Sequence, residues 1–433
     1  MKKIKFDISK CAVVLYWLVF IALLGLFFTN DFGLVDIHKT SIITAVGIDF
    51  EEDEVQVTAE IAVPQPSQSG ENIKYTQVQG SGRTIADALN EINSKTGFYP
   101  KLQFCRLILV GETCLERDLF QILGCFYRKN YSELTALVAT CEGNAKDMLA
   151  MKSEVSDMTS EAIRNVLSDE IKKSANANST NLKEIANAEF SKSATCYMPY
   201  IQATKPGTSE SGGDGDNVGG ESAGGGSGSG GGGGSSSGSE SGGGEGGASG
   251  GGGSSGGQSG GSSDEPVEFT ARKVACFSGG MFKCLLDEQQ SFALAVLTSD
   301  IRLAVLPCDA NDIHYTIGLK NVSGGAKLEV KDGVPEVKFS FFATAQIQGA
   351  RVKVDPEKTV DDDRVPEEVL KGAEQELERR MVALYDACKE NECDILQLGD
   401  QLYKYNNKYY GAFKNDILDR AKVTYDIKVV SVN

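Results

Sequence analysis

Histidine is almost absent from this chain, and with it the residue patterns of several common enzyme classes. The 433 residues include 2 histidines, His38 and His314, which lie far apart in the sequence. A Ser-His-Asp triad or an H-E-x-x-H zinc helix needs histidine in particular surroundings, and neither residue has them. Gly80–Thr84 lacks the spacing and the lysine of a phosphate-binding loop and is more typical of a strand–turn–helix junction. We therefore predict no enzymatic activity and no catalytic, cofactor-binding or metal-binding residue.

Cysteine pairs with the spacing of a metal or redox site are also missing. The 11 cysteines form no C-x-x-C pair, and most lie in apolar stretches, such as Cys105 in LQFCRLIL and Cys276 in VACFSGG. In such surroundings cysteine behaves as a small hydrophobic residue. The sequence favours buried free thiols, and it leaves one or two disulfides or a metal site open as alternatives.

The chain has no excess of positive charge. It contains 43 Lys and Arg against 60 Asp and Glu, which gives a net charge of −17. Nucleic acids and anionic lipid headgroups attract basic surfaces, so we expect neither to be the main partner. Part of the negative charge is concentrated between Lys205 and Arg272, where there are nine acidic residues and no Lys or Arg.

Glycine is concentrated in this same acidic segment. Of the 49 glycines in the chain, 29 lie within residues 207–261. Such a segment cannot bury enough apolar surface to offset the entropy lost on ordering. We predict a disordered Gly/Ser linker over residues 205–265, which would let the blocks on either side move apart unless they dock.

An uncharged apolar run follows a basic N-terminus. Residues 1–10 carry four lysines and one aspartate, and no charged residue occurs in Cys11–Phe28. Eighteen helical residues reach roughly 27 Å, close to the ~30 Å apolar thickness of a bilayer. The flanking charges predict a cytoplasmic segment at 1–10, a transmembrane anchor at 11–29 and export of the remaining chain. A cleaved signal peptide is disfavoured because no A-x-A site follows the run, and a buried soluble helix is the other alternative.

Alternating strand and helix patterns predict an α+β fold in two or three modules after the apolar run. In the first block, residues 36–204, two alternating strands on either side of Glu51–Glu54 predict a hairpin. Thr84, followed by Asp87, predicts the start of a helix. Residues 266–309 are interpreted as a small middle domain.

The C-terminal domain, residues 310–433, has the clearest pattern. Asp332-Gly333 predicts a hairpin turn, and a long helix is expected from Pro366. A shorter helix over Asp394–Lys404 and a final strand over Lys422–Val430 are also expected. The long helix has an apolar stripe formed by Val369, Ala373, Leu377, Met381, Leu384 and Cys388. A nearby aromatic cluster, interpreted as a corner of the core or as a sugar or partner surface, is formed by Tyr403, Tyr405, Tyr409, Tyr410 and Phe413.

Five segments of the sequence are informative in their order and spacing. They are VDIHKTSIITAVGIDFEEDEVQVTAEI (35–61), GRTIADALNEINSKTG (82–97), LQFCRLILVGE (102–112), FYRKNYSELTALVATCEGNAKDML (126–149) and CDILQLGDQLYKYNNKYY (393–410). Together they resemble the Ger(x)C proteins, the C subunits of the nutrient germinant receptors of endospore-forming bacteria. The resemblance covers nearly the whole chain outside the apolar run and the Gly/Ser segment.

The resemblance implies a non-enzymatic subunit, needed for receptor assembly or signalling, on the outer face of the inner spore membrane. It also implies two integral-membrane partners, one of them transporter-like and responsible for sensing nutrients. Members of the family are typically lipoproteins, but the matching place, Thr29–Gly33, has no cysteine, so no lipidation residue is predicted. A transmembrane anchor of the same orientation would replace the lipid. Two other hypotheses stay open: an exported ligand-binding module, and an envelope assembly factor outside a receptor.

Overall fold

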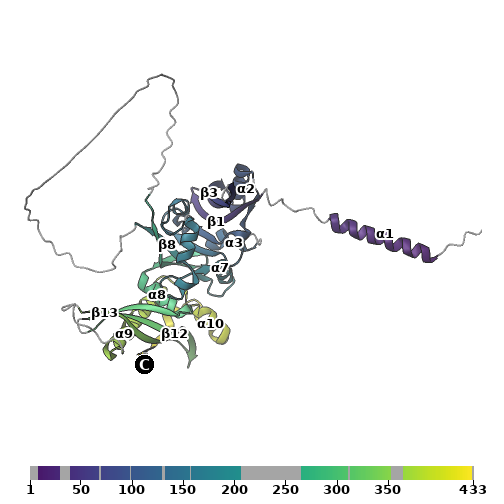
Figure 1. Cartoon of the computed structure of the whole chain (residues 1–433). Coiled ribbons are helices and arrows are strands. Elements are labelled where there is room, and N and C mark those ends of the chain that lie inside the picture. Colours follow the sequence, from purple (N-terminus) through teal and green to yellow (C-terminus); the bar gives the residue numbers. More distant parts are fainter. Residues whose placement is uncertain are drawn as a thin grey trace, which may run out of the picture.

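The structure, a computed structural model, is α+β as predicted (Figure 1). It describes residues 8–29, 40–67, 70–97, 99–128, 132–156, 158–205, 265–310, 313–352 and 364–431. His38 and nearly all of the predicted linker lie outside these residues. Within them the strands form two sheets, one of ten strands and one of four.

Helix α1 (Ile8–Thr29) contains the apolar run of the N-terminus. Its side chains are described at positions 13 and 15–25, where they are exposed and, apart from Gly25, hydrophobic. Across the described residues, no helix was found with the length and apolarity that a membrane span requires. The transmembrane anchor at 11–29 therefore stays a prediction.

The ten-stranded sheet has the order β10-β9-β8-β6-β5-β1-β2-β3, with β4 beside β1 and β7 beside β6. Its strands are β1 Thr40–Glu51, β2 Glu54–Ser67, β3 Gly70–Gly82, β4 Tyr99–Lys101, β5 Leu107–Val110, β6 Leu137–Cys141, β7 Thr180–Asn181, β8 Thr195–Thr204, β9 Glu268–Ser278 and β10 Met281–Leu286. The central neighbours β1, β5, β6 and β8 run parallel, and antiparallel hairpins form both edges. The hairpin predicted over Glu51–Glu54 is confirmed.

Helices cover both faces of this sheet. On one face lie α2 (Ile85–Thr96), α3 (Leu119–Arg128) and α7 (Leu182–Glu189). On the other lie α4 (Ala145–Ala150) and α5 (Thr159–Val166), with α6 (Asp169–Lys172) following α5. Single 3-10 turns form at η2 (Leu102–Phe104) and η3 (Glu112–Cys114). A parallel centre with both faces covered explains why its strands are apolar on both sides.

The junction between β3 and α2 confirms two predictions. The Thr84 hydroxyl accepts a hydrogen bond from the Asp87 backbone N–H at 3.2 Å, so Thr84 caps the helix. Gly80 lies directly against α2, where an added Cβ would be 2.9 Å from Cγ1 of Ile92. The glycines of this strand–helix junction thus allow close packing of α2 on the sheet.

The four-stranded sheet has the order β11-β12-β13-β14, with strands Leu303–Ala310, Ile313–Lys331, Val334–Val352 and Lys422–Ser431. The predicted turn joins β12 and β13, and Asp332 and Gly333 both have positive φ. Helix α9 (Glu367–Glu390) crosses over to β14, which runs parallel to β13. Every residue of the predicted apolar stripe of α9 is buried against this sheet. The remaining helices are α8 (Glu288–Thr298), α10 (Leu398–Tyr405), α11 (Asn407–Phe413) and α12 (Ile417–Arg420).

Helix α10 begins four residues later than the predicted Asp394–Lys404. The Asp394 carboxylate accepts hydrogen bonds from the backbone N–H groups of Leu398, at 2.9 Å, and Gly399, at 2.7 Å. Gln397 has a φ of 55°, in the left-handed region, which is not helical. Asp394 therefore lies before the helix and binds its first N–H groups, a role that short polar side chains often take.

The structure differs from two expectations about domain organisation. Residues 266–309 do not form a unit of their own, because β9 and β10 complete the first sheet and β11 belongs to the second. The predicted linker joins two neighbouring strands of the first sheet, since Thr204 at the end of β8 pairs with Glu268 at the start of β9. It therefore does not separate the two sheets.

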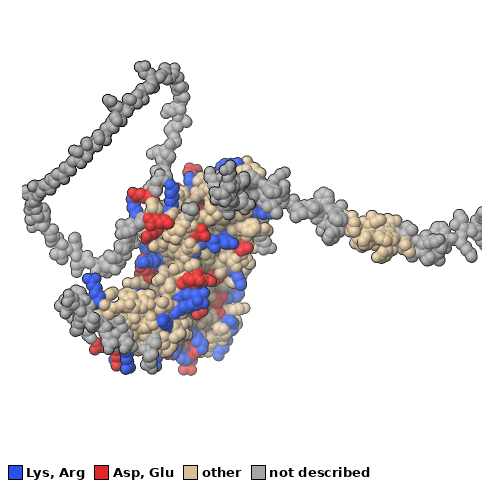
Figure 2. Space-filling view, viewed as in Figure 1, with Lys and Arg blue, Asp and Glu red and all other residues tan. Residues whose placement is uncertain are grey.

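The distribution of charged side chains and the burial of the cysteines agree with the sequence analysis. Figure 2 shows Lys and Arg side chains interspersed with Asp and Glu over the visible face of the folded part. Of the ten described cysteines, eight are buried and two half-buried, and the eight buried ones are free thiols, as their apolar surroundings predicted. Burial raises the pKa of most of these thiols, for example that of Cys105 to about 12, so they are protonated at neutral pH.

Candidate functional site

The contact between the two sheets is the candidate functional site, and helix α8 lies at its centre (Figure 1). Residues 291–297 of α8 are all buried. The helix contacts β9 and β10 of the first sheet and β12 and α9 of the second. A helix buried on all sides, here between two sheets, needs apolar residues all round, as SFALAVL provides.

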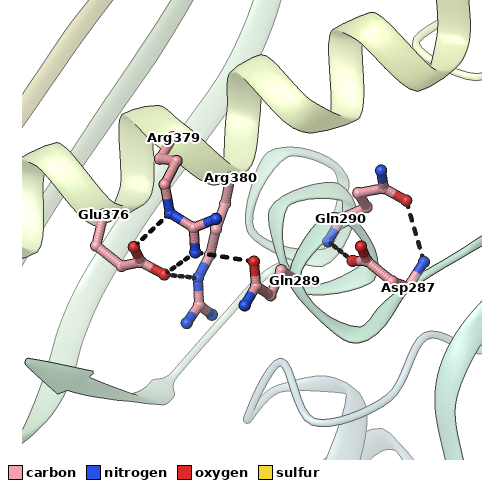
Figure 3. A network of polar contacts seen from close by, with 6 residues as sticks. All are labelled: Asp287, Gln289, Gln290, Glu376, Arg379 and Arg380. Atoms are coloured by element: carbon pink, nitrogen blue, oxygen red, sulfur yellow. Dashed lines mark hydrogen bonds and ion pairs between the residues drawn. The ribbon is translucent and has the colours of Figure 1, made fainter. Parts of the chain in front are cut away.

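The first turn of α8 is fixed by polar contacts (Figure 3). Asp287 and Gln290 form a capping box, in which the carboxylate accepts from the Gln290 backbone N–H at 2.8 Å and the amide oxygen accepts from the Asp287 N–H at 3.0 Å. Gln289, between them, accepts a hydrogen bond of 2.8 Å from Arg379 of α9. The start of α8 is thereby capped and joined to α9.

The α9 side of this contact is a small charged cluster. Glu376 accepts hydrogen bonds from the guanidinium groups of Arg379 and Arg380, with distances of 2.7 and 2.8 Å. The bonds from Arg379, followed by those from Arg380, hold the pKa of Glu376 below its usual range despite its partial burial. Arg380 also lies 4.9 Å above the Phe292 ring of α8, which adds a cation–π contact to the junction.

A second group of contacts joins Asp394 and the first turn of α10 to residues at and just before the start of β8. The Asp400 carboxylate accepts hydrogen bonds from the backbone N–H of Lys192, at 2.8 Å, and of Ser193, at 3.2 Å, and from the Ser193 hydroxyl. The Thr195 hydroxyl donates to the Asp394 carbonyl at 2.7 Å. Two aspartates of CDILQLGDQL thus hold the C-terminal domain against the start of β8. Sequence patterns alone could not identify this contact, because its partners are about 200 residues apart.

Asp49 has a comparable structural role inside the first sheet. Its carboxylate is buried at the end of β1 and accepts from the backbone N–H groups of Ala145, at 2.8 Å, and Lys146, at 2.9 Å. Burial raises the pKa of Asp49, and the two hydrogen bonds oppose this by favouring the ionised form. The carboxylate therefore satisfies the first N–H groups of α4, a pairing that no local sequence pattern indicated.

A cavity of about 710 Å³ lies at the same junction between the sheets. Its lining includes Asn178, which precedes β7, Arg272 of β9, Ser291 of α8 and Arg380 of α9. The Asn178 amide donates to the Ser291 carbonyl at 3.0 Å, and its buried Oδ1 has no hydrogen-bond partner in the described part of the chain. This contact therefore contains one buried acceptor whose hydrogen-bonding capacity is not used within the described residues.

The residues singled out in the sequence do not meet at one place. His314 lies on β12, half exposed, with Nδ1 2.7 Å from Oδ1 of Asp309. In the aromatic cluster, Tyr403 is 43% and Tyr405 is 68% exposed, whereas Tyr409, Tyr410 and Phe413 pack against the core. The cluster is therefore part core corner and part open surface. Among the described residues, no group of three or more His, Cys, Asp or Glu side chains could hold a metal ion.

The stability of the contact between the two sheets should depend on pH through Asp394. Burial raises the pKa of its carboxyl from 3.8 to about 7, so the folded state holds this proton more tightly than the unfolded chain. The resulting stabilisation is fully present below pH 3.8 and is lost as the pH rises through 7. We expect a loss on the order of 4 kcal/mol in the free energy of unfolding over this range from this residue.

The measurement is the difference in unfolding free energy between the wild type and Asp394→Asn, taken from pH 4 to pH 8 by denaturant titration. Asparagine at position 394 cannot ionise, so the wild type should lose stability relative to the variant as the pH rises. Parallel pH profiles for the two proteins would show that Asp394 does not titrate differently in the folded state.

Comparisons with known proteins match both halves of the chain. Residues 34–203 match the family model described as the spore germination protein N-terminal domain, and residues 272–431 match the one described as spore germination B3/GerAC like, C-terminal. No match was found among the curated proteins. A solved structure titled "Crystal Structure of the GerBC protein" is similar, with 12% sequence identity, a TM-score of 0.49 and coverage of 90% of this chain and 97% of that chain.

Proposed function

Because the chain belongs to the Ger(x)C family of spore germination proteins, we propose that it is the C subunit of a nutrient germinant receptor and has no enzymatic activity. The observation that carries the proposal is the match of both family domains, in order, over residues 34–203 and 272–431. The contacts of Asp49 and Asp400 support a structural role, since both carboxylates bind backbone N–H groups.

The proposed location is the spore or cell membrane, through a single span at residues 11–29. The uncharged run Cys11–Phe28 and the four lysines before it support an N-terminus in the cytoplasm and folded domains outside. The hydrophobic side chains described in α1 are exposed, as those of a helix that faces lipid would be. In this proposal the span takes the place of a lipid anchor, for which Thr29–Gly33 offers no cysteine.

The proposed partners are two integral-membrane subunits, one of them transporter-like. The folded domains would help to assemble the complex with these subunits or take part in its signalling. The junction around α8 is the part of the subunit best suited to transmit a change, because it joins two sheets through one buried helix and a few polar contacts. Residues 205–265 connect strands within one sheet, so we do not assign them the task of extending the C-terminal domain toward a partner.

The test is a pull-down of the intact protein from detergent-solubilised spore membranes, with identification of the chains that co-purify. We expect two proteins with several membrane spans each. As a control, a variant without residues 1–33 should move to the soluble fraction and lose both partners. If neither partner is recovered with the intact protein under conditions that preserve other membrane complexes, the receptor role is wrong.

A further inference from the structure

Two cysteines lie opposite each other in the hairpin formed by β9 and β10. Cys276 of β9 and Cys284 of β10 are register partners in this antiparallel pair. Residues opposite each other in such a pair have Cα atoms about 4.5–5.5 Å apart. A disulfide spans Cα atoms about 4.4–6.8 Å apart. The backbone therefore already places the two cysteines at a separation that a disulfide can bridge.

An irregularity in β10 turns Cys284 toward the side of the sheet where Cys276 lies. In a regular strand Phe282 and Cys284 would face the same way, because side chains alternate with a period of two. The register shifts between these two residues, so that Phe282 packs on the core beneath α2 and α3 and Cys284 packs on the core around α8 and α9. Cys276 is buried in the core around α8 and α9 as well. The bulge thus brings the two thiols to the same side.

The two thiols form a hydrogen bond and differ in exposure. Cys276 is fully buried, whereas Cys284 is half-buried. The hydrogen bond from Cys276 favours the thiolate of Cys284 and lowers the pKa of Cys284, and the same bond together with burial raises the pKa of Cys276. The thiolate is the nucleophilic form of cysteine. Cys284 is therefore the thiol that meets a reagent from solvent, and Cys276 is the second thiol in contact with it.

Two further cysteines of the same core are less well placed for a reaction. Cys388 at the end of α9 and Cys393 after it are both buried, and burial raises the pKa of Cys388 and that of Cys393, the latter to about 12. The Cys393 thiol donates to the carbonyl of Phe277 at 3.7 Å. Neither residue is on the β9–β10 hairpin. The pair within the hairpin is thus the one that combines a reachable thiol with a partner directly opposite.

We propose that Cys276 and Cys284 form a thiol–disulfide exchange site, which a small organic disulfide converts to a bond between β9 and β10. The Cys284 thiolate attacks one sulfur of the reagent, whose S–S bond breaks, and the first thiolate leaves. Cys276 then loses its proton, and its thiolate attacks the Sγ of Cys284 in this mixed disulfide and releases the second thiolate. Two cysteine thiols are oxidised and one reagent disulfide is reduced to two thiols, which take up the two protons.

The new bond would fasten an edge strand where the two sheets meet. Strand β10 is at the edge of the ten-stranded sheet, and it contacts both α8 and α9. Disulfides form and persist in oxidising surroundings outside the cytoplasm. The proposed function places the folded domains there, but the exchange itself requires neither a membrane partner nor the receptor role.

The experiment treats the full chain in detergent with oxidised glutathione at pH 8. After an acid quench and alkylation with iodoacetamide, the protein is digested with trypsin without reduction and the peptides are identified by mass spectrometry. Trypsin cleaves after Lys273, Lys283 and Arg302, so the two cysteines fall in separate peptides, 274–283 and 284–302. We expect these two peptides to be joined to each other and to separate on treatment with dithiothreitol.

The decisive variant is Cys276→Ser, which keeps a small side chain and removes the second thiol. Glutathione should then stay on Cys284, with about tenfold more mixed disulfide than in the wild type. Cys284→Ser, a change at the half-buried position, should leave Cys276 unmodified. Cys125→Ser changes the other half-buried cysteine of the described residues, is the matched control and should give the same joined peptides as the wild type.

Three results would overturn the proposal. Equal amounts of glutathione on Cys284 in the wild type and in Cys276→Ser would show that Cys276 does not complete the exchange. Alkylation of both cysteines after full exposure to the oxidant would show that no exchange takes place. A bond from Cys284 to the peptide of Cys388 or Cys393 would link the two sheets and make the assignment to the hairpin wrong. Failure of the pull-down would leave these peptide results intact, so the two proposals fail separately.

Discussion

Replacing Asp49 by alanine should lower the free energy of unfolding by about 3 kcal/mol. The carboxylate accepts from the N–H groups of both Ala145 and Lys146, and Ala145 is fully buried. Alanine would leave these donors without a partner, and each unsatisfied buried donor costs about 1–3 kcal/mol. A cavity beside Gly111 would add to the loss, since that glycine packs directly on the carboxylate. Urea unfolding of the full chain in detergent, followed by circular dichroism, measures the difference.

Two variants make this result specific. Asp147→Ala changes an exposed acid in the first turn of the same helix and should cost no more than about 0.5 kcal/mol. Asp49→Asn keeps one acceptor oxygen and should fall between the other two. If Asp49→Ala and Asp147→Ala unfold at the same urea concentration, Asp49 does not hold α4 in the way described.

Replacing Gly324 by alanine should destabilise the contact between the sheets by about 3 kcal/mol. Gly324 lies on β12 directly against α8, and an added Cβ would be 3.1 Å from the carbonyl carbon of Val296 and closer still to its oxygen. Helix α8 cannot move away, because the first sheet packs on its other side. We therefore expect the lost stability to be accompanied by faster hydrogen exchange in α8 and β12 than in β5 and β6.

The neighbouring glycine provides the control. Gly325 is the next residue of the same strand, and an added Cβ there would have no atom within 4 Å. Gly325→Ala should change the unfolding free energy by no more than about 0.5 kcal/mol. Equal effects of the two substitutions would mean that strand propensity, and not the approach of β12 to α8, determines the cost.

The features that could be predicted from the sequence depend on residues close together in the chain. The cap at Thr84, the turn at Asp332-Gly333 and the apolar stripe of α9 each arise within one element, so composition and spacing were enough. The limits of α10 were wrong because a single side chain, Asp394, binds the N–H groups that the helix would otherwise leave open. The helix propensities of the individual residues do not indicate these hydrogen bonds.

The features that could not be predicted depend on strand pairing over long distances. The middle unit expected at 266–309 is divided because β9 pairs with β8, and pattern alone does not tell which strand will be a neighbour. Contacts between a strand and a distant helix are equally hidden, since the Asp49 carboxylate binds N–H groups of Ala145 and Lys146 that lie almost 100 residues away. The parts of the candidate site missed in the sequence are thus contacts between elements, each formed by an ordinary polar residue.

The pairing of Thr204 with Glu268 has a consequence for how the chain tolerates changes of length. Residues 206–264 close a loop between two hydrogen-bonded strands, and Lys205 and Glu265 at its two ends form an ion pair of 3.0 Å. The entropy of loop closure grows only with the logarithm of length, so these residues cost roughly 2 kcal/mol more than a four-residue turn. Insertions and deletions in this loop therefore change only the small entropy cost of closing it, and they leave the spacing of the two sheets as it is.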